Sequence, residues 1–217
     1  MTERRLDEEF EKAGFYFDSE THKYFLDGKE VCHVTQILSD LGLTGLENVN
    51  RIVLETKAKF GTEVHNAIAM YERGQNLEFI VPEIFPYLNQ YQKFKDEFGI
   101  ETEEVEFSSY SNGWRYAGTI DQVGTITKGK YKGKRALMDY KTGAILPSAQ
   151  LQTAAYQILW EEHFKNRRVN VRIILQLSPE SFKAEFLVNN HENNLDRRIF
   201  LSALVIWKWK KENKLLQ

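Results

Sequence analysis

The spacing of hydrophobic residues changes near the middle of the chain. Up to residue 98, apolar residues recur every three or four positions, and this period is typical of amphipathic helices. The pattern predicts helices over 35–41, 47–60, 62–73 and 82–98. We expect Gly61 to separate the second of these helices from the third, because glycine weakens a helix interior. Two aromatic-rich runs, 15–17 and 23–26, predict a small N-terminal hairpin.

After Gly99 apolar and polar residues alternate, which is typical of strands. The pattern predicts three strands, a helix, two strands and a final helix, over about 105–108, 116–126, 136–140, 148–164, 171–177, 182–188 and 194–211. Successive strands followed by a helical crossover imply a mixed sheet with helices on both faces. We therefore expect an α/β fold. The length, together with the absence of a repeat or linker, predicts one domain over 1–217.

Charge and composition narrow the function classes. The chain has 29 Lys and Arg against 31 Asp and Glu, a net charge of −2, so no overall basic field attracts a polyanion. A local patch would have to do so, and the turn 128–135 carries five cations and no anion. The single cysteine, Cys32, excludes an internal disulfide, a four-cysteine zinc site and a four-cysteine iron–sulfur cluster. No apolar run reaches membrane-spanning length, and residues 1–9 are too polar for a signal peptide. We expect a cytoplasmic protein.

Acidic residues within predicted strands are the strongest chemical signal. Asp121 lies in an otherwise apolar strand, and Asp139 and Lys141 share one face at the end of the next strand. A carboxylate buried there is costly unless it is paired or binds a metal ion. Two acids from neighbouring strands would form a hard oxygen site suited to Mg²⁺ or Mn²⁺. The alternative is an ordinary Asp–Lys ion pair at a strand end.

Four segments carry a family resemblance. They are Gly61-Thr62-Glu63-Val64-His65, Gly118-Thr119-Ile120-Asp121, Asp139-Tyr140-Lys141-Thr142-Gly143 and Gln152-Thr153-Ala154-Ala155-Tyr156. In this order they resemble the motifs of the PD-(D/E)XK nuclease superfamily, and in particular its RecB-type branch, which includes phage exonucleases. The resemblance implies a restriction-endonuclease-like αβββαβ core within about 61–190. Residues 1–45, which hold the predicted hairpin and first helix, and the C-terminal helix within 191–217 lie outside the part that it explains.

The resemblance also implies roles for individual residues. The implied metal ligands are His65, Asp121, Asp139 and the backbone carbonyl of Tyr140. Asp121, Asp139 and Lys141 form the implied catalytic set, in which Lys141 lies beside the attacking water. Gln152 and Tyr156 are one helical turn apart and are similar to the Gln-x-x-x-Tyr motif that positions DNA.

Other candidate residues lie outside the four segments. Glu104 and Glu106 share a face of the first strand, and we prefer Glu104 as the acid that supports the metal ligands or binds a second metal ion. Lys130, Lys132 and Lys134 in the cationic turn are candidate contacts to the DNA backbone. Cys32 and His33 are adjacent, which is too cramped for a metal pair, so we interpret both as structural. The spacing of His22, His163 and His191 suggests no chemistry.

The combined prediction is a Mg²⁺- or Mn²⁺-dependent deoxyribonuclease, an exonuclease of phage-type DNA recombination or processing. It would act in the host cytoplasm if phage-encoded. DNA is the expected substrate, and a recombination or single-strand-annealing protein is a candidate partner. No Gly-x-x-x-x-Gly-Lys-Ser/Thr loop occurs, so no nucleotide cofactor is expected. The alternatives are a catalytically silent DNA- or protein-binding member of the same fold, and a metal-dependent hydrolase of small phosphorylated molecules.

Overall fold

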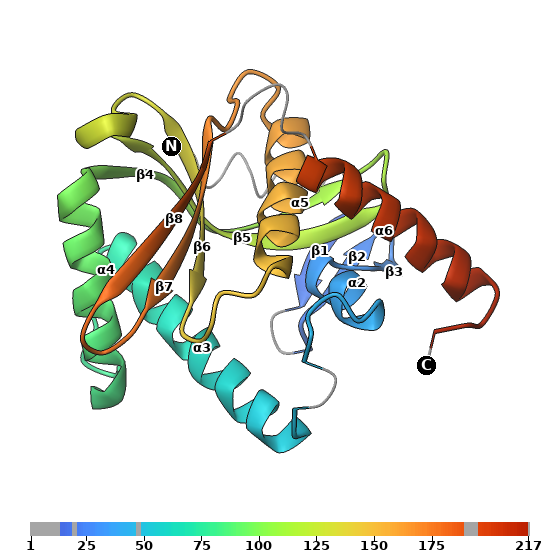
Figure 1. Cartoon of the computed structure of the whole chain (residues 1–217), viewed down its shortest axis with the longest axis horizontal. Helices are drawn as coiled ribbons and strands as arrows, with labels where there is room; N and C mark the ends of the chain where they lie inside the picture. The colour runs from blue at the N-terminus through green and yellow to red at the C-terminus, as the bar shows by residue number, and fades with distance from the viewer. Residues whose placement is uncertain (1–13, 19–20, 47–48, 189–194, 217) are drawn as a thin grey trace.

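A five-stranded mixed sheet forms the centre of the molecule (Figure 1). The computed structural model describes residues 14–18, 21–46, 49–188 and 195–216. In spatial order the strands are β4 (Ile100–Ser111), β5 (Tyr116–Ile126), β6 (Arg135–Lys141), β7 (Val171–Leu177) and β8 (Phe182–Val188). All neighbours are antiparallel except β6 and β7. A parallel pair needs a crossover, which α5 (Ser148–His163) supplies. The predicted α/β fold with a mixed sheet and a restriction-endonuclease-like core is confirmed.

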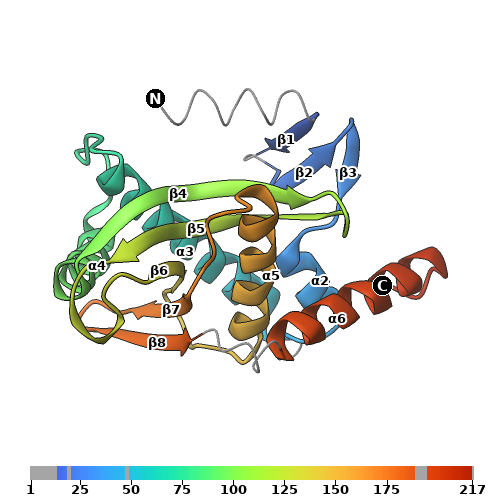
Figure 2. The same cartoon turned by 90° about the horizontal axis from the view of Figure 1, so that it is seen from above.

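Helices cover both faces of this sheet (Figures 1 and 2). One face packs against α3 (Arg51–Glu72), the short 3-10 helix η1 (Pro82–Ile84) and α4 (Phe85–Phe98). The other face packs against α2 (Val34–Asp40), α5 and α6 (Leu195–Glu212). Consecutive residues of β6 enter opposite cores: Leu137 packs under α5, while Met138 and Tyr140 pack under α3 and α4. This arrangement explains why β6 is apolar almost throughout.

A second, smaller sheet lies at the N-terminal end of the described chain. It contains β1 (Phe15–Asp18), β2 (Lys23–Leu26) and β3 (Lys29–Val31), all antiparallel. The predicted hairpin is therefore confirmed and extended by a third strand. The chain that follows β3 joins the large sheet, because the N–H of Ala117 on β5 donates to the carbonyl of Cys32 over 2.9 Å. An isolated parallel bridge pairs His33 with Ala117.

The prediction of a helix break at Gly61 is wrong. Residues 51–72 form one continuous helix, α3, with Gly61 in its interior. A glycine costs a helix about 1 kcal/mol relative to alanine, and burial of Val64 and Ile68 against the sheet outweighs that cost. Gly61 lies where α3 passes Thr142, whose hydroxyl oxygen would be 3.4 Å from an added Cβ.

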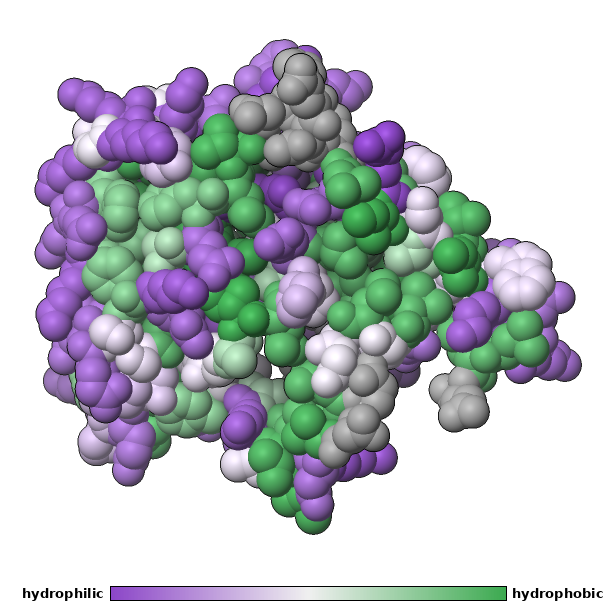
Figure 3. All heavy atoms as spheres, in the orientation of Figure 1, coloured by the Kyte–Doolittle hydropathy of each residue, from purple (hydrophilic) through white to green (hydrophobic). Residues whose placement is uncertain are grey.

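The C-terminal helix α6 is only partly buried. Trp207 packs into the core beneath it, while Trp209 is exposed, as expected from positions two apart on a helix. Figure 3 shows hydrophobic and hydrophilic residues interspersed along α6. Within the described ranges, no helix is both long enough and apolar enough to cross a membrane. The polar N-terminus at 1–9, His191 and the predicted start of the final helix at residue 194 lie outside the described residues.

Candidate metal centre and active site

Three acidic side chains meet at one register position on three adjacent strands. The pairs on either side of Glu106 place it opposite Asp121, on β4 and β5 respectively. The last pair between β5 and β6 is Gln122 with Met138, so the next position sets Asp121 opposite Asp139. Side chains at directly opposed positions have Cβ atoms about 4.5–5.5 Å apart. Glu106, Asp121 and Asp139 therefore form a row of carboxylates across the sheet.

His65 reaches this row from α3. Its Nδ1 lies 3.4 Å from Oδ1 of Asp121 and 3.9 Å from Oε1 of Glu106. Its Nε2 lies 3.1 Å from the carbonyl oxygen of Tyr140. One nitrogen or oxygen atom from each of His65, Glu106 and Asp121 falls within 4.8 Å of the others. An ion between them could bind all three.

Asp139 is the most buried acid of the row, with 1% of its surface exposed. Nζ of Lys141 forms an ion pair with its Oδ2 at 2.8 Å. Oδ1 of Asp139 and Oε1 of Glu106, in contrast, have no hydrogen-bond partner among the described residues. Buried oxygens without partners are costly. A divalent cation would satisfy the Glu106 oxygen, because His65, Glu106 and Asp121 form the group whose donor atoms could share one ion. Among the described residues Asp139 lies outside that group, although the sequence predicts it as a ligand.

The pKa values of Asp139, Glu106 and His65 are also consistent with a cation site. Burial raises the pKa of Asp139 to about 6 although Lys141 opposes the shift. Burial and the charge of Asp121 raise the pKa of Glu106 to about 7. For His65, burial acts to lower the pKa, but the charge and hydrogen bond of Asp121 prevail and raise it to about 9. The cluster thus retains protons near neutral pH, because clustered carboxylates need nearby positive charge.

Asp121 is the anionic member of the row. Burial acts to raise its pKa, but the charge and hydrogen bond of His65 lower it overall. The backbone N–H of Tyr140 also donates to its Oδ2 over 2.7 Å. Tyr140 therefore contacts the cluster through both backbone groups, since its carbonyl faces His65. Carboxylates and a carbonyl are the hard donors that Mg²⁺ and Mn²⁺ bind, and an imidazole adds preference for Mn²⁺.

A chain of hydrogen bonds links Lys141 to α5. Nζ of Lys141 donates to Oε1 of Gln152 over 3.0 Å, and Nε2 of Gln152 donates to the hydroxyl of Tyr156 over 3.1 Å. Tyr156 packs directly on Gly118 of β5, where an added Cβ would lie 2.7 Å from its ring. The glycine of the Gly118–Asp121 segment thus leaves room for the tyrosine of the fourth segment. The structure brings together the residues that sequence motifs single out.

A cavity of about 310 Å³ opens beside this centre. One side carries the metal centre and α5. The other side comes from the N-terminal sheet and the start of α2. The residues that line the cavity are Phe17, His22, Tyr24, His33, Val34, Thr35, Thr62, His65, Asn66, Glu106, Gly118, Thr119, Asp121, Gln152 and Tyr156. The N-terminal elements, which the family motifs do not cover, therefore help to form the site.

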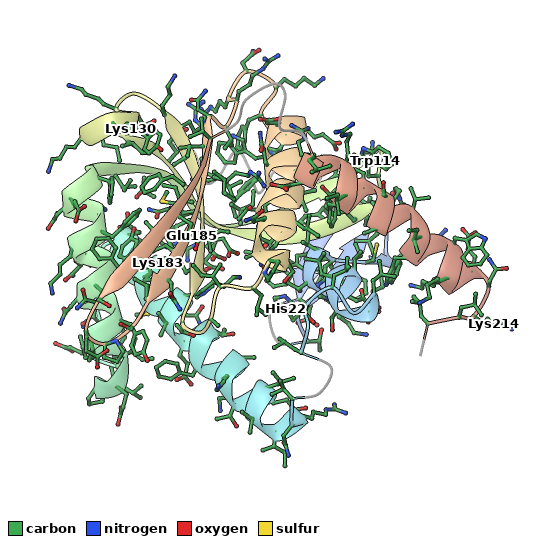
Figure 4. All side chains as sticks on the ribbon, in the orientation of Figure 1. His22, Trp114, Lys130, Lys183, Glu185 and Lys214 are labelled. Atoms are coloured by element: carbon green, nitrogen blue, oxygen red, sulfur yellow. The ribbon has the colours of Figure 1, made fainter. Side chains whose placement is uncertain are left out.

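The cationic turn does not reach the centre. Lys130 lies in the short 3-10 helix η2 (Gly129–Tyr131), before the first residue of β6, whereas Asp139 and Lys141 lie at the opposite end of that strand. A strand of this length spans about 20 Å. Figure 4 shows Lys130 well separated from His22, which lines the cavity. Lys130, Lys132 and Lys134 therefore lie away from the group formed by His65, Glu106 and Asp121.

Sequence reasoning missed three residues of the site. Glu106, rather than the preferred Glu104, joins the group formed by His65 and Asp121 in the described chain. The two glutamates alternate identically along the strand, so only the register distinguishes them. His22 and His33 line the cavity, although the spacing of His22 indicates no chemistry and His33, next to Cys32, is interpreted from the sequence as structural. Their proximity, with ring centroids 5.4 Å apart, arises from the fold of the small sheet.

Comparison with known proteins identifies the class. The family model of the PD-(D/E)XK nuclease superfamily matches residues 50–205. This range includes His65, the carboxylate row and the Gln152–Tyr156 pair. The chain belongs to the PD-(D/E)XK nuclease superfamily.

Similarity to individual proteins is weak. The crystal structure of SSO0001 is 16% identical, with a TM-score of 0.36 over 71% of this chain and 70% of the other. A protein of Eubacterium rectale described as a candidate exonuclease is 10% identical, with a TM-score of 0.43 over 72% and 69%. These values are too low to inform the activity of this chain. No match was found among curated proteins.

Proposed function

We propose that this chain is a Mg²⁺- or Mn²⁺-dependent deoxyribonuclease that hydrolyses phosphodiester bonds. The observation that carries the proposal is the group of His65, Glu106 and Asp121, whose donor atoms lie within 4.8 Å of one another beside the buried Asp139–Lys141 pair. The centre lies in an open cavity, so an extended substrate has access to it. Family membership implies a nucleic acid as that substrate.

His65, Glu106, Asp121, Asp139 and the Tyr140 carbonyl would hold the cation. A bound divalent cation lowers the pKa of water and neutralises charge on a phosphate. Asp121 stays anionic, which favours cation binding. Lys141 presents an ammonium group beside Asp139, with its direction set by Gln152. In that position it can orient the attacking water and stabilise negative charge that develops on the phosphate.

The finer assignment is an exonuclease of phage-type DNA recombination or processing. It is supported by the RecB-type pattern of the fourth segment, in which Gln152 and Tyr156 lie beside Lys141. A catalytically silent protein is a weaker interpretation, because a binding protein has no need to place Glu106, Asp121 and Asp139 side by side, where like charges repel.

The test uses end-labelled linear DNA and covalently closed circular DNA, each single- and double-stranded, with Mg²⁺, Mn²⁺ or EDTA. We expect metal-dependent loss of linear DNA and persistence of closed circles. Asp139→Asn and Lys141→Ala should lower the cleavage rate at least about 100-fold. Lys183→Ala, which changes an exposed lysine on β8, is the matched control and should cleave normally. Inertness of the wild type toward every DNA would overturn the proposal.

A further inference from the structure

The strands and turn of the N-terminal sheet, together with the N-cap of α2, present aromatic rings to the cavity. Phe17 and Tyr24 stack with centroids 4.5 Å apart. His33 lies 5.6 Å from Tyr24, and His22 lies 5.4 Å from His33. All four residues line the same cavity as Asp121 and His65. We call these four residues the aromatic wall.

Several contacts hold the aromatic wall in place. The hydroxyls of Tyr24 and Thr119 are hydrogen-bonded at 2.8 Å, and Thr119 is two residues before Asp121. His33 caps α2 by accepting a hydrogen bond from the backbone N–H of Gln36. The backbone of His22 is left-handed, with φ of 53°. Such a conformation is uncommon for a residue other than glycine and is often found at functional sites.

The charges around the cavity suggest what the wall contacts. Burial lowers the pKa of His22, and it lowers that of His33 to about 4. Both imidazoles are therefore neutral near pH 7. The lining residues, all within the described chain, include neither Lys nor Arg. A phosphate would find no cationic side chain at this wall, whereas a flat, uncharged ring would find aromatic surface on which to stack.

We propose that the cavity is a nucleobase subsite, in which the base next to the scissile phosphate packs between the rings of His22 and His33, stacked on one and in edge contact with the other, since the two rings are inclined at 78°. The inference rests on the proposed nuclease function and specifies how that site recognises its substrate. A base can enter the cavity only when it is unpaired. The subsite therefore favours single-stranded DNA or the frayed end of a duplex.

The variants can be chosen to preserve the fold. Asparagine tolerates the left-handed conformation of residue 22, and it is among the best N-cap residues for position 33. His22→Asn and His33→Asn therefore remove the rings while meeting both backbone requirements. The matched control is His163→Asn, at the end of α5, where the ring packs on Phe107 and Phe164 outside the cavity. Thermal unfolding should show that all variants are folded.

The first measurement places one abasic nucleotide at successive positions of a single-stranded oligonucleotide. For the wild type and His163→Asn we expect kcat/KM to fall about 5- to 100-fold at one position, the loss that corresponds to one base stack. In the double variant His22→Asn/His33→Asn, natural DNA should be cleaved more slowly and the abasic penalty should shrink toward one. A full penalty in the double variant, or none at any position in the wild type, would overturn the inference.

The second measurement does not need turnover. An oligonucleotide with 2-aminopurine at one position is titrated with protein in EDTA and, separately, in Ca²⁺. Stacking should quench its fluorescence with wild type and with His163→Asn, and the double variant should lose the quenching. If no DNA is cleaved yet this pattern holds, the proposed catalysis fails and the subsite stands. If cleavage is normal but quenching is the same in all proteins, the subsite fails and the catalysis stands.

Discussion

Glu106 shows how a single backbone irregularity can shape a site. Its φ is 50°, a left-handed value for a non-glycine residue, and the ladder between β4 and β5 shifts register between Thr102 and Glu104. Such strain costs on the order of 1–3 kcal/mol, and the rest of the fold must offset it. Sequence alternation treats Glu104 and Glu106 alike, so the choice between them depends on register and strain that no local pattern encodes.

The two glutamates provide a matched pair of variants. Glu106→Gln removes a carboxylate from the metal centre and should weaken Mn²⁺ binding at least about tenfold. Glu104→Gln makes the same chemical change two residues away and should leave the affinity nearly unchanged. Isothermal titration with Mn²⁺ measures both values. Equal losses in the two variants would remove Glu106 from the ligand set.

Protons and metal ions should compete for the centre. From about pH 4 to about pH 9, the metal-free folded protein holds protons on Asp139, Glu106 and His65 that the unfolded chain has released, since all three pKa values are raised. These groups therefore make the metal-free protein less stable as pH rises through that range. Asp121 has the opposite effect on stability, because its pKa is lowered on folding, and this effect falls below about pH 4.

We accordingly expect the rise in Tm caused by Mg²⁺ or Mn²⁺ to grow between about pH 6 and about pH 8, because metal binding must displace those protons. Thermal unfolding with and without metal at each pH measures this increment. Asp139→Asn removes one proposed ligand and should make the metal-induced rise in Tm depend less on pH. An increment that is constant with pH in the wild type would contradict the assigned ligands.

At the scale of elements, α5 and β5 are in contact through Gly118. An added Cβ at this position would lie 2.7 Å from the Tyr156 ring and 3.2 Å from Val34. Gly118→Ala should displace Tyr156 and so disturb Gln152 and Lys141, at a cost of about 1–3 kcal/mol in unfolding free energy. Gly113→Ala is the control, because an added Cβ there has no neighbour within 4 Å. Denaturant unfolding and cleavage rates should change for the first variant alone.

The pattern of apolar and polar residues predicts a strand or helix well where no long-range contact changes its limits. β7 and β8 follow the predicted ranges because both are rich in apolar residues and Ser178 to Ser181 form a clear turn between them. β4 begins at Ile100, before the predicted 105–108, because its polar first half is stabilised by pairing with β5. The break expected at Gly61 fails for a similar reason, since tertiary packing outweighs local propensity.

For the site, the motifs singled out His65, Asp121, Asp139, Lys141, Gln152 and Tyr156, and the fold places these residues together. The wall that faces them could not be predicted in the same way. It depends on the small sheet meeting β5 at Ala117, a long-range contact with no counterpart in local sequence.

At the scale of the whole molecule, five residues along β6 separate Lys134, the last cation before the strand, from Asp139, a span of about 16 Å. At about 3.4 Å per nucleotide, DNA would need roughly five nucleotides to bridge them. Changing Lys130, Lys132 and Lys134 together to Ala should leave cleavage of shorter oligonucleotides unaffected. The same change should weaken binding of long DNA and flatten its dependence on salt concentration. An unchanged salt slope with long DNA would exclude this turn as a phosphate contact.

The junction between Cys32 and Ala117 has a consequence for the products. Because the chain that follows β3 is joined to the strand that carries Asp121, backbone contacts connect the aromatic wall to that acid. A base seated on the wall is then held at a constant offset from the bond that breaks. For the proposed nuclease, the length of each released fragment would then depend on that offset rather than on base sequence.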